Sequence, residues 1–219
     1  HDVEVGDLDD DGIVDLVARN QSAFGGDGSH VYLFYGSRDG EWKQRAIEGP
    51  AGEGVKLVDV DADGRPDIVL NAWWYRNPGA RDASWTGYHY ARTWDWPHAV
   101  VDVADFDGDG RRDIVLSPAE PAGRRYRIAW FQAPVDRTQA WAEHPIDTDV
   151  ETVYHSLVAA DVDLDGRVDV VTAAMHQGQA PQEVRMYRRR ADGGWERQVI
   201  ADGGSHNLRL ADIDGDGDL

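Results

Sequence analysis

A nonapeptide of the form D-x-D-x-D-G-x-x-D recurs along the chain and places carboxylates at positions 1, 3, 5 and 9 of a short loop. Alternating oxygen donors around a sharp turn, with glycine at position 6, form the hard-oxygen cage that Ca²⁺ prefers. The repeats therefore predict one calcium ion per complete copy. The predicted ligands are Asp7, Asp9, Asp11 and Asp15; Asp59, Asp61, Asp63 and Asp67; Asp105, Asp107, Asp109 and Asp113; Asp161, Asp163, Asp165 and Asp169; and, in a fifth copy without a ninth-position aspartate, Asp212, Asp214 and Asp216.

Two other interpretations of these loops are weaker. An EF-hand needs glutamate at position 12 and a helix on either side, whereas the twelfth residues here are Ala18, Leu70, Leu116 and Thr172. A surface turn rich in aspartate and glycine could also occur without a metal, but five copies in register favour calcium. The predicted ligands make up 19 of the 41 acidic residues, so the net charge of −19 is largely a property of these loops.

The copies begin 46 to 56 residues apart, which is about the length of a four-stranded propeller blade. An alternating segment precedes each loop, a β-branched run follows it, and further strand-like segments complete most repeats. The sequence thus predicts an all-β propeller with four complete blades and the start of a fifth. A closed ring of four blades is possible, but the incomplete fifth repeat favours part of a larger propeller of about seven blades. The expected blades are residues 1–49, 50–96, 97–149, 150–203 and 204–219.

A second recurring position lies six residues before each loop, at the opposite end of the first strand. Its occupants are His1, Glu53, Ala99, His155 and His206, and His98 stands beside Ala99. These histidines could cap turns or pack on aromatic neighbours. They could instead bind a second metal such as Zn²⁺ or Mn²⁺, or act as acids and bases near neutral pH. Spacing alone does not separate these alternatives, because the groups come from different blades.

Loops expected at the same rim carry aromatic and polar residues. Exposed aromatic planes beside amide and charged groups are suited to holding sugars. The residues predicted to bind carbohydrate are Trp73, Trp74, Trp94, Trp96, His98, Asn20, Arg76, Glu120 and His176. The tryptophans that recur in one register are instead expected in the core; they are Trp42, Trp85, Trp141 and Trp195.

The segment from Val3 to Val17, VEVGDLDDDGIVDLV, resembles the FG-GAP or VCBS repeat of integrin α-subunits and of secreted bacterial proteins. The resemblance implies a propeller in which calcium binds between the first and second strands of each blade. Similar repeats occur in polysaccharide lyases and in a sugar dehydratase. The chain could therefore bind or cleave carbohydrate, and the integrin resemblance implies the alternative of a non-catalytic adhesion or protein-interaction module.

Elimination from a uronate would need a cation beside the carboxylate and a base for the C5 proton. Arg19 or a metal held by histidines could supply the first, and His155 or Tyr154 the second. The predicted catalytic group is completed by His1, His206 and Glu53.

Composition excludes some partners. Acidic residues outnumber basic ones by 41 to 22, which argues against nucleic acid binding. No apolar stretch is long enough to span a membrane. Calcium loops of this kind favour an extracellular or periplasmic location, and the chain is expected to accompany further domains of a longer protein.

Overall fold

The computed structural model describes residues 2–19, 29–179 and 181–215. The chain divides into two compact units. Residues 1–101 and 133–142 form the first unit, and residues 102–132 and 143–219 form the second. All regular structure among the described residues is β-strand, and these residues contain no helix that could cross a membrane.

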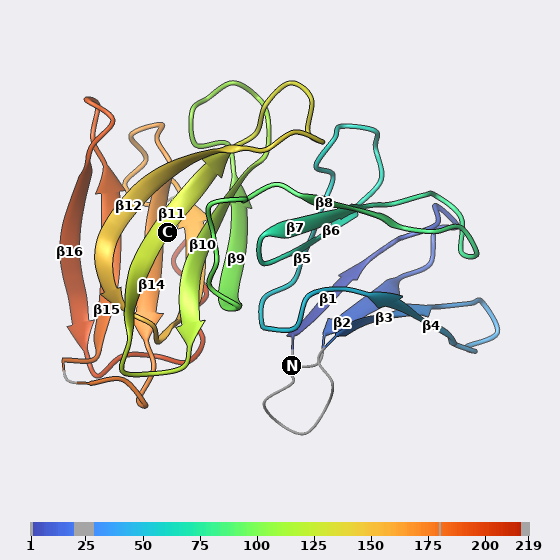
Figure 1. Cartoon of the computed structure of the whole chain (residues 1–219), viewed down its shortest axis with the longest axis horizontal. Coiled ribbons are helices and arrows are strands. Elements are labelled where there is room, and N and C mark those ends of the chain that lie inside the picture. Colours follow the sequence, from blue (N-terminus) through green and yellow to red (C-terminus); the bar gives the residue numbers. More distant parts are fainter. Residues whose placement is uncertain (1, 20–28, 180, 216–219) are drawn as a thin grey trace. The chain divides into compact units, whose positions relative to one another are not determined.

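Four sheets follow one another along the chain, each antiparallel and each with four strands (Figure 1). The first blade contains β1 (Asp2–Gly6), β2 (Asp15–Arg19), β3 (His30–Tyr35) and β4 (Lys43–Glu48). The second contains β5 (Lys56–Val58), β6 (Asp67–Leu70), β7 (Trp73–Arg76) and β8 (Thr86–His89). Both belong to the first unit.

The third blade contains β9 (His98–Ala104), β10 (Asp113–Glu120), β11 (Arg125–Gln132) and β12 (Ala142–Glu151). The fourth contains β13 (Tyr154–Ala160), β14 (Asp169–Ala174), β15 (Glu183–Arg189) and β16 (Trp195–Asp202). In each sheet the strands are neighbours in chain order, and each acidic loop joins the first strand to the second. The predicted all-β class with four-stranded antiparallel blades is confirmed.

The apolar core lies on the faces of the sheets, and the second strand of three blades is almost completely covered. β6 and β14 are buried at every position and β10 at all but its last. In the first unit one core cluster takes side chains from both blades, including Val17, Leu33, Ile68 and Leu70. A strand that is covered on both faces has a run of β-branched residues and no polar–apolar alternation. Such a run follows each acidic loop.

The acidic loops share one backbone conformation. Position 4 has a left-handed φ of about 60° in three loops, at Asp10, Ala62 and Leu164, and glycine takes this position in the third loop. The conserved glycine at position 6 is left-handed in all four complete loops. Glycine adopts this conformation without steric cost, which explains why position 6 is invariant among the copies.

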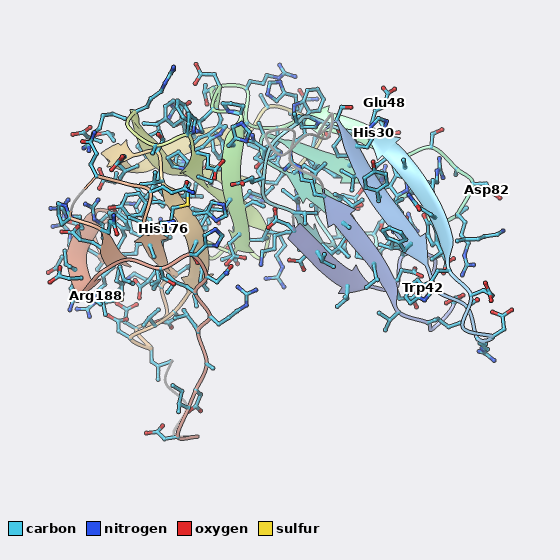
Figure 2. All side chains as sticks on the ribbon, turned by 90° about the horizontal axis from the view of Figure 1, so that it is seen from below. His30, Trp42, Glu48, Asp82, His176 and Arg188 are labelled. Carbon is cyan, nitrogen blue, oxygen red and sulfur yellow. The ribbon has the colours of Figure 1, made fainter. Side chains whose placement is uncertain are left out.

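Two expectations were wrong, one about a strand and one about the burial of a tryptophan. The segment Leu208–Ala211 was expected to open a fifth blade but forms no strand; its Leu208 N–H instead donates to Ser156 Oγ at 2.6 Å. Trp42 was expected in the core, yet it is 51% exposed. It lies at the end of the first blade (Figure 2). Trp42 precedes the outermost strand β4, where its ring lies against the backbone of Gly36 instead of entering the core.

Candidate functional site

Within each complete loop the first aspartate closes the turn by accepting backbone N–H groups. Asp7 accepts from Asp11 at 3.2 Å and from Gly12 at 2.8 Å. Asp59, Asp105 and Asp161 make the equivalent pair of bonds. These bonds hold the turn in a fixed shape, so the carboxylates that follow are oriented by local backbone geometry.

The ninth-position aspartate is buried and anchors the loop to its sheet. Asp67 accepts from Val60 N at 3.0 Å and from Asn77 N at 2.8 Å, and its exposed fraction is zero. The pKa of this carboxyl is raised to about 7, mainly by burial; its two backbone hydrogen bonds lower the pKa and the nearby carboxylates raise it. The pKa values of Asp15 and Asp169 are raised for the same main reason.

Three of the four carboxylates in each complete loop converge. One carboxylate oxygen from each of positions 1, 3 and 9 lies within 4.8 Å of the other two in every complete loop. The groups are Asp7, Asp9 and Asp15; Asp59, Asp61 and Asp67; Asp105, Asp107 and Asp113; and Asp161, Asp163 and Asp169. Convergent hard-oxygen donors, one of them buried in every complete loop, fit a divalent cation such as Ca²⁺.

The fifth-position aspartates, although predicted as ligands, face arginines and lie outside these groups. Asp63, Asp109 and Asp165 each pair with the arginine two residues later in the chain. In the first loop Asp11 pairs with Arg81 at 2.6 Å, and Arg81 also contacts Asp9. Arginines therefore balance part of the loop charge, a role that the sequence pattern did not indicate.

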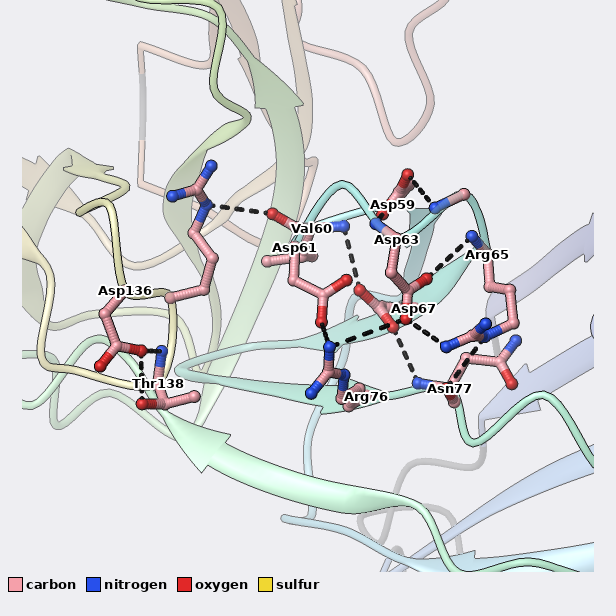
Figure 3. Close-up of polar contacts among 12 residues, drawn as sticks. Asp59, Val60, Asp61, Asp63, Arg65, Asp67, Arg76, Asn77, Asp136 and Thr138 are labelled. Carbon is pink, nitrogen blue, oxygen red and sulfur yellow. Dashed lines mark hydrogen bonds and ion pairs between the residues drawn. The ribbon is translucent and has the colours of Figure 1, made fainter.

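Arg76 was predicted at the sugar-binding rim, and this position was wrong. Its Nη2 lies 2.6 Å from Asp61 Oδ2, beside the second acidic loop (Figure 3). β7 runs back toward the loop that precedes β6, so the last residue of β7 returns to the acidic edge of the sheet. Arg188 near the end of β15 makes the equivalent contact with Asp163 in the fourth blade, at 2.9 Å.

Asn77 joins the first two acidic loops and was missed at the sequence level. Its Nδ2 donates to Leu8 O at 2.9 Å and to Pro66 O at 3.0 Å, and its side chain is buried. Because Asn77→Ala would leave these two carbonyl groups without their donor, we expect the free energy of unfolding to fall by about 1–3 kcal/mol. Urea denaturation measures this change, and Asn77→Asp, which keeps the shape but loses the donor, should be no more stable than Asn77→Ala.

Arg19 and Glu53, both predicted to be catalytic, form a buried contact network in the first unit. Arg19 donates to the carbonyl oxygens of Glu53, Gly54 (2.6 Å) and Pro50 (2.7 Å). Burial lowers the pKa of Arg19 to about 10, and the charges of Asp2 and Glu53 oppose that shift. Arg19 is 1% exposed and Glu53 is fully buried, so the guanidinium holds a loop and balances nearby charges.

The predicted sugar-binding tryptophans divide into buried and partly exposed residues. Trp74 and Trp94 are 0% and 3% exposed, which corrects their assignment as exposed stacking planes. The Trp74 ring stacks on Tyr88, and its Nε1 donates to Arg137 O at 3.2 Å. Both contacts hold the ring in the core. Trp73 is half-buried and lies parallel to His89, with ring centroids 4.7 Å apart. Trp96 and His98 are also half-buried.

In the second unit, Tyr154 and His155 stand at the start of β13, at a β-bulge opposite the end of β14. The ring centroids of His155 and His206 are 4.3 Å apart, so these two predicted residues do meet. His155 is 7% and Tyr154 2% exposed. Burial is the main reason why the pKa of Tyr154 is raised to about 12, which disfavours it as a base near neutral pH.

The same unit contains a pocket of about 290 Å³ at the edge of its sheets opposite the acidic loops. Of the predicted residues only Tyr154 lines it. Its other charged or amide-bearing walls are Arg124, Arg125, Glu151, Gln179 and Arg185. These residues come from four separate segments and share no register, so the repeat pattern gave no signal for them.

The remaining predicted residues do not line this pocket. Glu120 is half-buried at the end of β10, and His176 is exposed after β14 (Figure 2). Asp212 and Asp214 are exposed in the fifth loop, where Gly215 N–H donates to Asp212 at 2.6 Å. His1, Asn20 and Asp216 lie outside the described residues.

Comparison with known sequences supports the repeat assignment. A family model described as FG-GAP-like repeat matches residues 7–70, 59–116 and 161–219, well over half of the chain. No curated protein matches the chain significantly.

Proposed function

Since the chain belongs to the FG-GAP-like repeat family, we propose that it is a calcium-stabilised module that binds carbohydrate at the sheet edge opposite its acidic loops. The observation that carries this proposal is that the second unit has its acidic loops and its pocket at opposite edges of its sheets. Carboxylates converge at one edge of its sheets, whereas the pocket with arginine, amide and tyrosine side chains lies at the other.

Calcium would be held by the aspartates at positions 1, 3 and 9 of each complete loop. The ion would supply positive charge to carboxylates that otherwise repel one another, and so would stiffen each first hairpin. Such sites suit an extracellular or periplasmic setting, where free calcium is abundant. We place the protein there on this ground.

Carbohydrate is favoured as the ligand by the mixed character of the pocket. Pro181 is exposed and offers apolar surface, with the buried Tyr154 and Ala174 behind it in the lining, while Gln179 and the arginines offer hydrogen-bond donors. Sugar rings present both an apolar face and hydroxyl groups, so they match walls of this kind.

A binding panel tests the proposal. The calcium-loaded chain would be titrated with uronate-containing and neutral polysaccharides by isothermal titration calorimetry. Saturable binding to at least one is expected. Absence of binding to every polysaccharide, together with capture of a protein ligand, would support an adhesion module instead.

The His155–His206 pair favours a second candidate, elimination from a uronate with His155 as the base. Arg19 and Tyr154 fit that chemistry poorly, because the first is buried among carbonyl groups and the second has a raised pKa. The two imidazoles could also bind Zn²⁺ or Mn²⁺. Absorbance of unsaturated product, with His155→Ala as the control, tests catalysis directly; no product from any uronate polysaccharide would reject it.

A further inference from the structure

We propose that the pocket of the second unit is a subsite for one carboxylate-bearing sugar ring, bound through Arg124 and Arg125. This inference rests on the proposed function and names the class of sugar. The whole pocket lies within one unit, between the β10–β11 turn, the junction of β12 and β13, and the β14–β15 loop. Its volume of about 290 Å³ is at the lower end for ligand pockets, which suits a single ring.

The charge of the lining favours an anion. The lining contains three arginines and one carboxylate; the arginines are Arg124, Arg125 and Arg185, and the carboxylate is that of Glu151. Both oxygens of Glu151 already accept backbone N–H groups, from Gly123 at 3.0 Å and from Gln179 at 2.8 Å. Glu151 therefore ties two walls of the pocket together, and the hydrogen bonds offset its negative charge.

Two arginines are fixed in place by acids that do not line the pocket. Arg125 Nε donates to Asp149 Oδ1 at 2.6 Å, and Arg185 Nε donates to Glu183 Oε2 at 2.6 Å. Arg125 Nη2 also donates to Asp149 O at 2.5 Å. A guanidinium presents five N–H donors in a planar fork, so Arg125 keeps the N–H groups of Nη1 to receive a further carboxylate. The pre-set side chains would lose little rotamer entropy when a ligand binds.

The floor of the pocket is suited to a sugar ring. The Arg185 guanidinium lies 4.9 Å from the centre of the Tyr154 ring, which orients both groups. β-Bulges lie at both: one spans Tyr154 and Ser156, and the other lies between Val184 and Arg185. Bulges re-aim side chains at sheet edges beside binding sites, so they account for two large side chains turned toward one cavity.

Calorimetry on the full calcium-loaded chain tests this assignment with glucuronate, glucose and glucose 6-sulfate as probes. We expect glucuronate to bind and glucose to bind at least ten-fold more weakly. The double variant Arg124→Gln, Arg125→Gln should weaken glucuronate binding at least ten-fold. Both side chains are exposed, so the variant is expected to fold, which its calcium-dependent melting would verify.

Arg190→Gln supplies the matched control, because it removes an exposed arginine that pairs with Asp192 in the same unit. Its affinity for glucuronate should equal that of the unaltered chain. Equal binding of glucose and glucuronate, or an unchanged affinity in the double variant, would overturn the subsite while leaving carbohydrate binding intact. Preference for glucose 6-sulfate over glucuronate would overturn the carboxylate assignment. Failure of the unaltered chain to bind any polysaccharide would remove both proposals.

Discussion

Replacement of Arg19 by alanine is expected to lower the free energy of unfolding by about 3–5 kcal/mol, because it leaves buried groups without their charge partner. The guanidinium is 1% exposed and donates to the carbonyl oxygens of Pro50, Glu53 and Gly54. Its removal would also leave the buried Glu53 side chain without the nearby positive charge. Urea denaturation monitored by tryptophan fluorescence measures the loss.

Arg38→Ala is the matched control, since Arg38 is exposed in the β3–β4 turn and its removal should change stability by no more than about 0.5 kcal/mol. Arg19→Lys should recover only part of the loss, because an ammonium group does not reproduce the planar fork that reaches three carbonyl groups. Normal stability of Arg19→Ala combined with lost turnover of a uronate would instead return Arg19 to a direct role in chemistry.

The fold was predictable because its main signal is local. Each acidic loop closes its turn with hydrogen bonds inside the nonapeptide, as Asp59 does with Asp63 and Gly64. The strands around the loops follow from β-branched runs of fixed spacing. A feature that depends only on neighbouring residues and repeats four times can be recognised without knowing how the sheets pack.

The sugar-binding rim was harder to predict because it depends on strand direction and burial. Arg76 follows Trp73 by three residues, yet the strand between them carries it to the acidic edge. Trp74 differs from Trp73 only by the alternation of side chains across β7, which directs one ring into the core. Strand direction and side-chain alternation through the second hairpin therefore decide where Arg76 and Trp74 lie.

The pocket was not predictable from repeats at all. Glu151 and Gln179 meet through a hydrogen bond between an acid at the end of β12 and a backbone N–H in the loop after β14. Neither Glu151 nor Gln179 belongs to the recurring nonapeptide. In a repeat fold, the residues that determine ligand specificity are therefore those that differ between the copies, whereas the residues that stabilise the fold are those that recur.

The metal-free protein is expected to lose stability as the pH rises from 4 to 7, and calcium should abolish that loss. Burial raises the pKa of Asp67 from 3.8 to about 7. A carboxyl with a raised folded pKa stabilises the fold fully below its unfolded pKa, and this contribution disappears as the pH rises through the folded value. The shift corresponds to about 4 kcal/mol from Asp67, and Asp15 and Asp169 act in the same direction.

Calcium binds the ionised carboxylates, so its binding free energy offsets the cost of ionising them in the folded protein. Urea denaturation at pH 4, 5.5 and 7, with metal-stripped and calcium-loaded protein, tests the expectation. Some exposed aspartates, such as Asp39 and Asp136, have lowered pKa values and act in the opposite sense, but solvent screens them. Metal-free stability that stays level or rises across this window would show that the buried ninth-position carboxylates are not the groups that make the fold depend on a cation.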